Sequence, residues 1–170
     1  MVAIFTGDGK GKTTAAIGTV VRAAGHGFRA CIICFLKGKD YIHGENSILS
    51  KLPNVTLTNF GQAGWVNREN INPEHKKQAG LALAAAKEAI NSDKYDIIVL
   101  DEINITIDLG LIDLDKVIKL IKDRPKKMEL ILTGRYANPK LLQMADLVTE
   151  MKNIKHPFMR GVTARRGIDY

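Results

Sequence analysis

A glycine-rich turn near the N-terminus joins an apolar segment to an alanine-rich one, and it constrains the fold more than any other feature of the chain. Residues 2–5 are apolar and short enough to form one buried strand. Gly7, Gly9 and Gly11 let the following backbone curl with its N–H groups pointing inward. The helix expected from Thr13 adds the positive end of its dipole at the same place. A strand, a loop and a helix in this order predict a site for polyphosphate.

The side chains of this loop predict separate roles at a bound nucleotide. Lys12 is placed to reach phosphate oxygens, and the hydroxyl of Thr13 is placed to ligate Mg²⁺. The motif G-x-x-x-x-G-K-S/T is matched only in its second half, because Thr6 stands at the position of the first glycine. A basic surface turn is the alternative, but the strand before and the helix after favour nucleotide binding. We expect the nucleotide to be bound by Gly7, Asp8, Gly9, Lys10, Gly11, Lys12, Thr13 and Thr14.

Composition limits the class of protein but does not identify a function. The chain has 170 residues, of which 45% are hydrophobic and 25% charged, so we expect one domain over residues 1–170. The net charge of +7 favours anionic partners in general, but no nucleic-acid-binding motif accompanies it. No apolar stretch approaches the length of a membrane span, and no basic leader precedes the loop. We therefore expect a cytoplasmic protein without nucleic-acid or membrane partners.

Cys31 and Cys34 form a C-x-x-C pattern that can indicate redox chemistry or a metal site. Here they lie in an apolar segment, 29–36, that is typical of a buried strand. Residues three apart on a strand point to opposite faces, so the two thiols cannot share a bond or an ion. We therefore interpret both as thiols of the core.

Apolar strands and helical segments alternate along the rest of the chain. Strands are predicted at residues 2–5, 29–36, 55–60, 95–100, 128–133 and 146–151. Helices are predicted from residue 13 onward and at 46–52, 73–91, 103–111, 113–122 and 138–144. On the first helix, the apolar residues Ile17, Val20, Val21 and Ala24 have the i, i+3, i+4, i+7 spacing that is typical of one helix face. The alternation predicts an α/β fold with a doubly wound, mostly parallel sheet of about six strands and helices on both faces.

Two of these strands end in polar residues that are expected at the ligand-binding edge of the sheet. Asp101 and Glu102 follow an apolar strand, where an acid can meet the Mg²⁺ of a bound nucleotide, so both are candidate metal ligands. The alternative is a pair that caps the next helix. Arg135 follows the strand at 128–133, and it either stabilises developing phosphate charge or forms a local salt bridge. The sequence leaves both alternatives for Arg135 open.

The loop at residues 61–72 contains two glycines, several amides and Trp65, the only tryptophan of the chain. A tryptophan in such a loop is either an anchor that packs back on the domain or a platform for a ligand, and the anchor is the commoner case.

Several ordered motifs resemble the ATP:corrinoid adenosyltransferases of the cobalamin pathway, along nearly the whole chain. These motifs are 6–16, 22–27, Lys37-Gly38 with Gly44-Glu45, 100–104, 108–112, 132–135, 145–151, 155–158 and 164–170. The resemblance implies a RecA-like phosphate-loop fold. It also implies that the Co(I) of a reduced corrinoid attacks C5′ of ATP and that triphosphate leaves.

The resemblance further assigns roles and partners. Lys12 and Trp65 are implied as catalytic residues, Asp101 and Glu102 as ligands of Mg²⁺ or Mn²⁺, and Glu102 with Arg135 as nucleotide contacts. ATP and a corrinoid are the implied substrates, a reductase would supply Co(I), and a homodimer is expected.

The chain departs from the family at two places. The family presses aromatic side chains against the lower face of the corrin, and only Trp65, with Phe60 as a weaker candidate, is available here. The chain also starts at its first strand, without the N-terminal segment that resembles a lid in longer relatives. The alternative functions are a generic phosphate-loop ATPase or kinase, which would produce ADP, and a RecA-like motor stimulated by nucleic acid.

Overall fold

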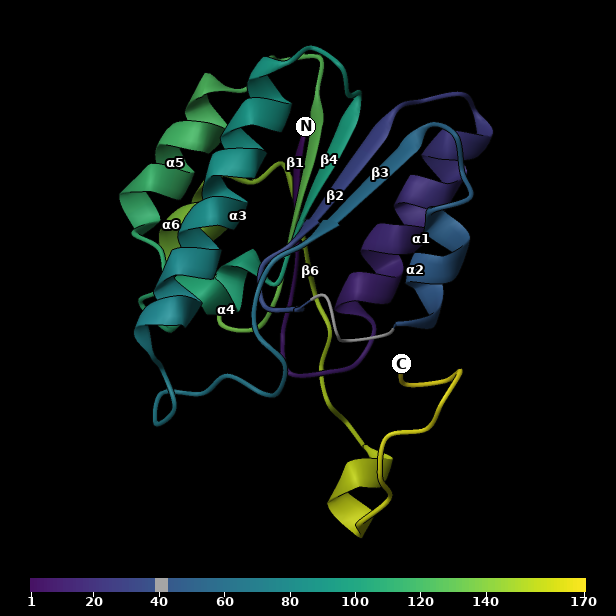
Figure 1. Ribbon diagram of the computed structural model, residues 1–170, viewed down its shortest axis with the longest axis vertical. Coiled ribbons are helices and arrows are strands. Elements are labelled where there is room, and N and C mark those ends of the chain that lie inside the picture. Colours follow the sequence, from purple (N-terminus) through teal and green to yellow (C-terminus); the bar gives the residue numbers. More distant parts are fainter. Residues whose placement is uncertain (39–42) are drawn as a thin grey trace.

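In the computed structural model, the described residues, 1–38 and 43–170, form one parallel sheet of six strands in the order β3-β2-β4-β5-β1-β6 (Figure 1). The strands are β1 (Val2–Thr6), β2 (Ala30–Cys34), β3 (Val55–Asn59), β4 (Ile97–Asp101), β5 (Glu129–Thr133) and β6 (Leu147–Glu150). The helices are α1 (Lys12–Gly25), α2 (Gly44–Leu49), α3 (Pro73–Asn91), α4 (Ile103–Asp108), α5 (Leu114–Asp123), α6 (Pro139–Met144) and the 3₁₀ helix η1 (Pro157–Arg160).

Helices cover both faces of the sheet. α1 and α2 lie on one face, and α3, α4, α5 and α6 lie on the other (Figure 1). Every residue of β2 and β4 is buried, because strands covered on both sides must be apolar throughout. Alternate residues of one strand therefore enter different cores: Ile32 packs on the α1 face and Ile33 on the α3 face.

The predicted fold class is confirmed, and the sheet is parallel throughout. Each predicted strand is present, with ends that differ by one or two residues. On α1, Lys12, Ala16 and Val20 are buried, Ile17 and Ala23 pack partly buried against the same core, and Val21 is 48% exposed. The side of α1 that packs on the sheet thus includes Ile17 and Val20 but not Val21. The sequence also predicts a polar loop at 37–45, close to the ligand-binding edge, and its residues 39–42 lie outside the described residues.

The predicted start of α3 is confirmed in detail. The Asn72 side chain accepts a hydrogen bond from His75 N at 3.0 Å, and His75 Nδ1 accepts one from Asn72 N at 3.3 Å. Pro73 occupies the first helical position, where it costs no hydrogen bond. This cap fixes the end of the loop at 61–72.

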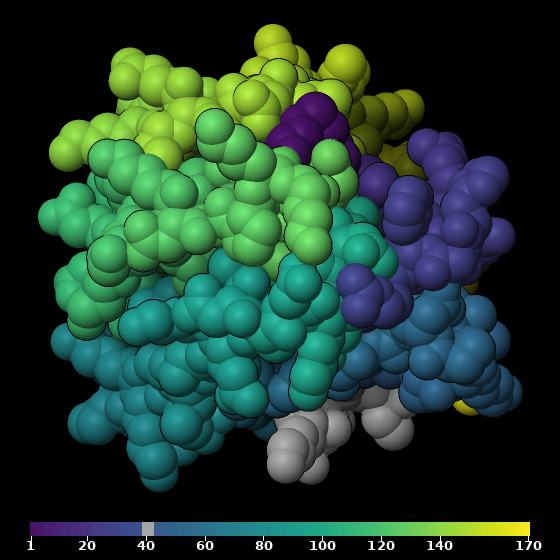
Figure 2. All heavy atoms as spheres, turned by 90° about the horizontal axis from the view of Figure 1, so that it is seen from above, coloured from purple at the N-terminus to yellow at the C-terminus, as the bar shows by residue number. Residues whose placement is uncertain are grey.

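Because all strands are parallel, the loops that follow them gather at one edge of the sheet. This edge lies at the lower end of the sheet in Figure 1, and the tail from residue 152 extends beyond it. Figure 2 looks onto the opposite end of the molecule, where the N-terminal residues, in purple, reach the surface. Among the described helices, none has the length and apolar character needed to span a membrane.

The two cysteines lie on opposite faces of β2, as predicted. Cys31 belongs to the core on the α3 face and Cys34 to the core on the α1 face, and both are free. Burial raises the pKa of both thiols, that of Cys31 to about 11.

We therefore predict that both thiols of the folded protein react slowly with Ellman's reagent at mildly alkaline pH, because little thiolate is present. Both should react fully after unfolding in guanidinium chloride, which serves as the control. Rapid modification of the folded protein, or a metal ion found between the thiols, would contradict the assignment.

Candidate functional site

The glycine-rich loop after β1 is built against the segment that follows β6. Gly9 N donates a hydrogen bond to Met151 O at 2.7 Å, and a Cβ atom on Gly9 would lie 2.7 Å from the same oxygen. Gly7 and Gly11 have φ values of +96° and +115°, which favour glycine. The glycines are thus required by backbone conformation and by close approach, as the motif predicts.

Thr6 replaces the first glycine of the motif without strain. Its φ is not positive, so its conformation does not require glycine. Its buried hydroxyl instead accepts a hydrogen bond from Ala137 N at 3.3 Å, which ties the end of β1 to the loop after β5.

Lys12 is buried inside the loop. Its Nζ donates a hydrogen bond to Gly9 O at 2.5 Å. Burial lowers the pKa of Lys12, and the nearby Glu102 carboxylate partly opposes this shift. A lysine held in this way presents a poorly hydrated ammonium group, whose interaction with an anion is stronger than in water.

Asp101 is the centre of a buried polar network. Thr13 Oγ1 donates to Asp101 Oδ1 at 2.8 Å, and Thr133 Oγ1 donates to the same oxygen at 2.7 Å. Asp101 is only 1% exposed. Burial alone would raise the pKa of Asp101, but Lys37 and the two hydroxyls hold it below its ordinary value. The carboxylate is therefore kept ionised beside the hydroxyl of the loop.

Lys37 is a further member of this network. The sequence predicts a loop near the ligand-binding edge at 37–45, but it assigns Lys37 no partner there. Its Nζ lies 2.8 Å from Asp101 Oδ2. Burial alone would lower the pKa of Lys37, but the Asp101 carboxylate outweighs this effect and raises it. The sequence shows a lysine three residues after the end of β2. That this lysine lies near Asp101 follows only from the strand order, which places β2 beside β4.

Glu102 lies next to Asp101, and its carboxylate lies close to Gly134, just after β5. It has a φ of 63°, which is uncommon for a residue with a side chain. Its N–H donates to Thr133 Oγ1 at 2.9 Å, and a Cβ atom on Gly134 would lie 3.2 Å from Glu102 Oε2. The side chain makes no capping hydrogen bond to α4, so the capping interpretation is wrong. Burial, and then the charge of Asp101, raise the pKa of Glu102.

The oxygen ligands at this edge fit a magnesium ion that arrives with a nucleotide. Thr13 and Asp101 place a hydroxyl and a carboxylate side by side, and Mg²⁺ commonly uses one or two such ligands together with phosphates and waters. Within residues 1–38 and 43–170, no cluster of three or more His, Cys, Asp or Glu side chains suits a metal ion. The side chains of these described residues therefore do not surround a metal ion without further ligands.

Arg135 lies at the same edge, after β5. It is exposed and takes part in no ion pair with the residues that the structure describes, so the predicted local salt bridge is not observed. Its positive charge adds to the lowering of the Lys12 pKa by burial, and it opposes the rise in the pKa of Glu102.

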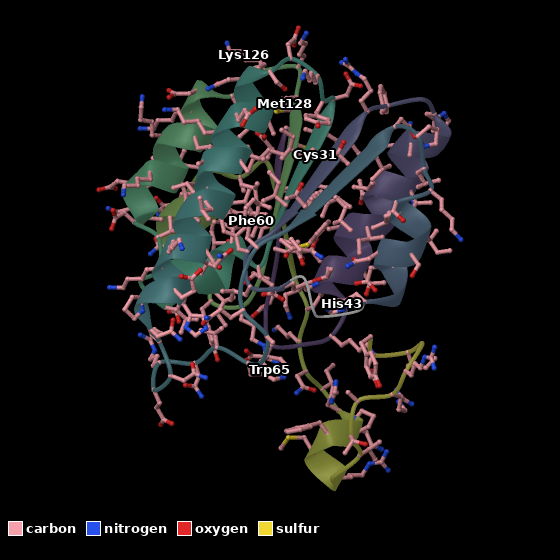
Figure 3. The ribbon with its side chains drawn as sticks, viewed as in Figure 1. Cys31, His43, Phe60, Trp65, Lys126 and Met128 are labelled. Atoms are coloured by element: carbon pink, nitrogen blue, oxygen red, sulfur yellow. The ribbon has the colours of Figure 1, made fainter. Side chains whose placement is uncertain are left out.

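Trp65 is not a packing anchor, because its ring is 84% exposed. Polar contacts hold its loop instead: Asn70 Nδ2 donates to Trp65 O at 2.7 Å, and Arg68 pairs with Asp108 at 2.8 Å. Figure 3 shows Trp65 at the edge where the phosphate loop lies, whereas Phe60 sits higher, against the core. The structure thus brings Trp65, but not Phe60, to the exposed surface near the site.

Lys10, predicted to bind nucleotide, contacts the tail. Its Nζ donates to Ile168 O at 2.8 Å and forms an ion pair with Asp169. Arg165 also pairs with Asp169, at 3.0 Å, and these contacts hold the pKa of Asp169 far below its usual value. The outer side of the phosphate loop is therefore tied to the C-terminal end of the chain, while Thr14 is exposed beside it.

Known proteins are similar to this chain along its whole length. Residues 1–170 match the model of a family described as ATP:corrinoid adenosyltransferase BtuR/CobO/CobP. The chain is 36% identical over 174 residues to corrinoid adenosyltransferase CobA of Salmonella typhimurium, covering 100% of this chain and 85% of that protein. It is 32% identical over 169 residues to the corrinoid adenosyltransferase of Pseudomonas aeruginosa, covering 98% and 82%. It is also 37% identical over 166 residues to the uncharacterized protein all2391 of Nostoc sp., of which it spans 44%.

The match extends over the whole chain and includes the phosphate loop, the acidic pair after β4 and the tail, so this chain belongs to the ATP:corrinoid adenosyltransferase family.

Proposed function

We propose that the chain transfers the 5′-deoxyadenosyl group of ATP to the Co(I) centre of a reduced corrinoid and releases triphosphate. Membership in the family supports both substrates. The observation that carries the proposal is the buried Lys12, held in a glycine loop beside the Thr13–Asp101 pair, at the edge where Trp65 is exposed. The glycine loop at this edge suits a triphosphate, and the exposed Trp65 ring offers an aromatic surface.

The reaction needs stabilisation of charge rather than transfer of a proton. A cobalt–carbon bond forms at C5′ while the C5′–O bond breaks, and the electron pair of that bond leaves with the triphosphate. Cobalt gives up two electrons in forming the new bond, from Co(I) to Co(III). Negative charge therefore grows on the oxygen that the loop N–H groups and Lys12 are placed to stabilise.

Mg²⁺, or Mn²⁺, would neutralise further phosphate charge when it is bound. In this proposal Thr13 and Asp101 hold the ion and Glu102 is a third oxygen ligand near it. Glu102 acts in binding metal and nucleotide and not as a general base. Arg135, which has no ion pair among the described residues, contacts the phosphates.

Trp65 is proposed to contact the lower face of the corrin, where it would help to displace the axial ligand before Co(I) forms. Its exposure of 84% leaves the ring available for such a contact. A reductase that supplies Co(I), a homodimer and a cytoplasmic location remain predictions from the sequence.

The products of the reaction test the proposed function. With ATP, Mg²⁺ and a chemically reduced corrinoid, we expect equal amounts of inorganic triphosphate and adenosylated corrinoid, measured by chromatography and by the visible spectrum. Accumulation of ADP and phosphate, with or without the corrinoid, would instead identify a generic phosphate-loop ATPase.

The substitution Lys12→Ala tests the electrostatic role of the loop. Because charge accumulates on the leaving oxygen only as its bond lengthens, we expect turnover to fall about a hundredfold or more, the scale of losing one preorganised group. The affinity for ATP, measured by calorimetry, should fall less. Lys51→Ala, at an exposed lysine after α2, is the control and should leave both quantities unchanged. Equal losses in turnover and in affinity would assign Lys12 to ground-state binding only.

The substitution Trp65→Ala tests the corrin contact. If the ring helps to displace the nucleotide ligand, turnover with cobalamin should fall about tenfold more than turnover with cobinamide, which has no such ligand. Phe28→Ala removes another exposed aromatic side chain, just before the amino end of β2, and should affect neither substrate. A similar loss with both corrinoids would rule out a role in ligand displacement.

A further inference from the structure

Lys37 and Asp101 form a buried ion pair at the proposed metal site. Lys37 Nζ lies 2.8 Å from Asp101 Oδ2, and the two side chains are only 17% and 1% exposed. The other carboxylate oxygen of Asp101, Oδ1, accepts hydrogen bonds from Thr13 and Thr133. Both oxygens of the carboxylate are thus engaged by the protein itself.

A buried carboxylate with this geometry needs a counter-ion, because removal of an unpaired charge from water costs far more free energy than its hydrogen bonds return. Lys37 provides that positive charge. A divalent cation that binds Thr13 and Asp101 must therefore share the carboxylate with Lys37 or displace the ammonium group. Like charges close together in a poorly solvated site repel strongly, which favours displacement.

The backbone next to Lys37 is closely packed, so displacement of the ammonium group is expected to involve the side chain. A Cβ atom on Gly38 would lie 2.8 Å from Gln62 C, and one on Gly61 would lie 3.0 Å from Lys37 N. The segment after β2 is thus packed against the start of the loop that carries Trp65. A displaced ammonium group stays within reach of the edge where the phosphates are proposed to bind.

We propose that Lys37 is the built-in counter-ion of Asp101, which a metal ion displaces, so that divalent metal binds well only together with a nucleotide. The phosphates supply new partners for the Lys37 ammonium group and further oxygen ligands for the metal. Lys37 is in this sense a positioning residue that couples the binding of metal to that of nucleotide. The inference rests on the proposed function, because it assumes a metal site at Thr13 and Asp101.

Binding of Mn²⁺, followed by electron paramagnetic resonance, tests this coupling without any turnover. In the wild-type protein we expect weak binding of Mn²⁺ alone and much tighter binding with a non-hydrolysable ATP analogue. Lys37→Met should tighten the binding of Mn²⁺ alone by about tenfold or more, because the carboxylate no longer has a competing cation. The factor by which the ATP analogue tightens Mn²⁺ binding should become smaller at the same time. Lys37→Arg keeps the charge and should behave more like wild type.

Two controls make the result specific. Lys127→Met removes an exposed lysine that pairs with Asp93 at 2.9 Å, before β5 at the amino end of the sheet, and should not change Mn²⁺ binding.

Thermal unfolding should show a lower Tm for Lys37→Met without metal, and Mn²⁺ should raise that Tm more than it raises the wild-type value. If Lys37→Met does not fold, Lys37→Gln, whose amide still donates a hydrogen bond, replaces it in the same comparison.

The outcomes separate this inference from the proposed function. If the wild-type protein binds Mn²⁺ with the ATP analogue but Lys37→Met and Lys37→Gln bind Mn²⁺ alone no better than wild type, the counter-ion role of Lys37 is wrong and the metal site remains. If Thr13→Ala leaves binding of Mn²⁺ with the analogue unchanged, the metal lies elsewhere and the proposed site itself is wrong.

Discussion

The site depends on one buried carboxylate, that of Asp101 at the end of a central strand. Its partners come from three other parts of the chain: Thr13 from the first turn of α1, Thr133 from β5 and Lys37 from the segment after β2. β2 and β5 are the two neighbours of β4, so the strand order decides which side chains can reach this carboxylate. Because an ionised group in this environment must be fully compensated, the network also fixes the phosphate loop relative to the sheet.

The parts of the structure that follow from local sequence were predictable. Strands covered on both faces are continuously apolar and bounded by turns, and the phosphate loop combines a glycine pattern with a strand and a helix. Lys37 and Thr133 were not predictable as partners of Asp101, because their proximity depends on which strands are neighbours. That order results from packing of the whole chain, and the Lys37-Gly38 motif does not specify it.

Trp65 shows a different limit of reasoning from sequence. A lone tryptophan in a polar loop is usually an anchor, because its large ring gains most by burial. Here the loop obtains its order from polar contacts: Asn70 holds the Trp65 carbonyl, and Arg68 pairs with Asp108 on α4. Because these contacts and the capped start of α3 fix the loop, the ring is not needed for packing. Which residues stabilise a loop is a question of geometry, and composition does not answer it.

The charges at this edge suit a reaction in which no proton moves. Three basic side chains surround two acidic ones at this edge: Lys12, Lys37 and Arg135 lie around Asp101 and Glu102. This excess of positive charge suits an anionic ligand. Glu102, the acid that a hydrolytic enzyme could use as a base, lies close to Gly134, with Asp101, Lys37 and Lys12 as charged neighbours. Alkyl transfer from ATP to cobalt requires only that growing charge on the triphosphate be neutralised, which is the role proposed for the cations of this edge.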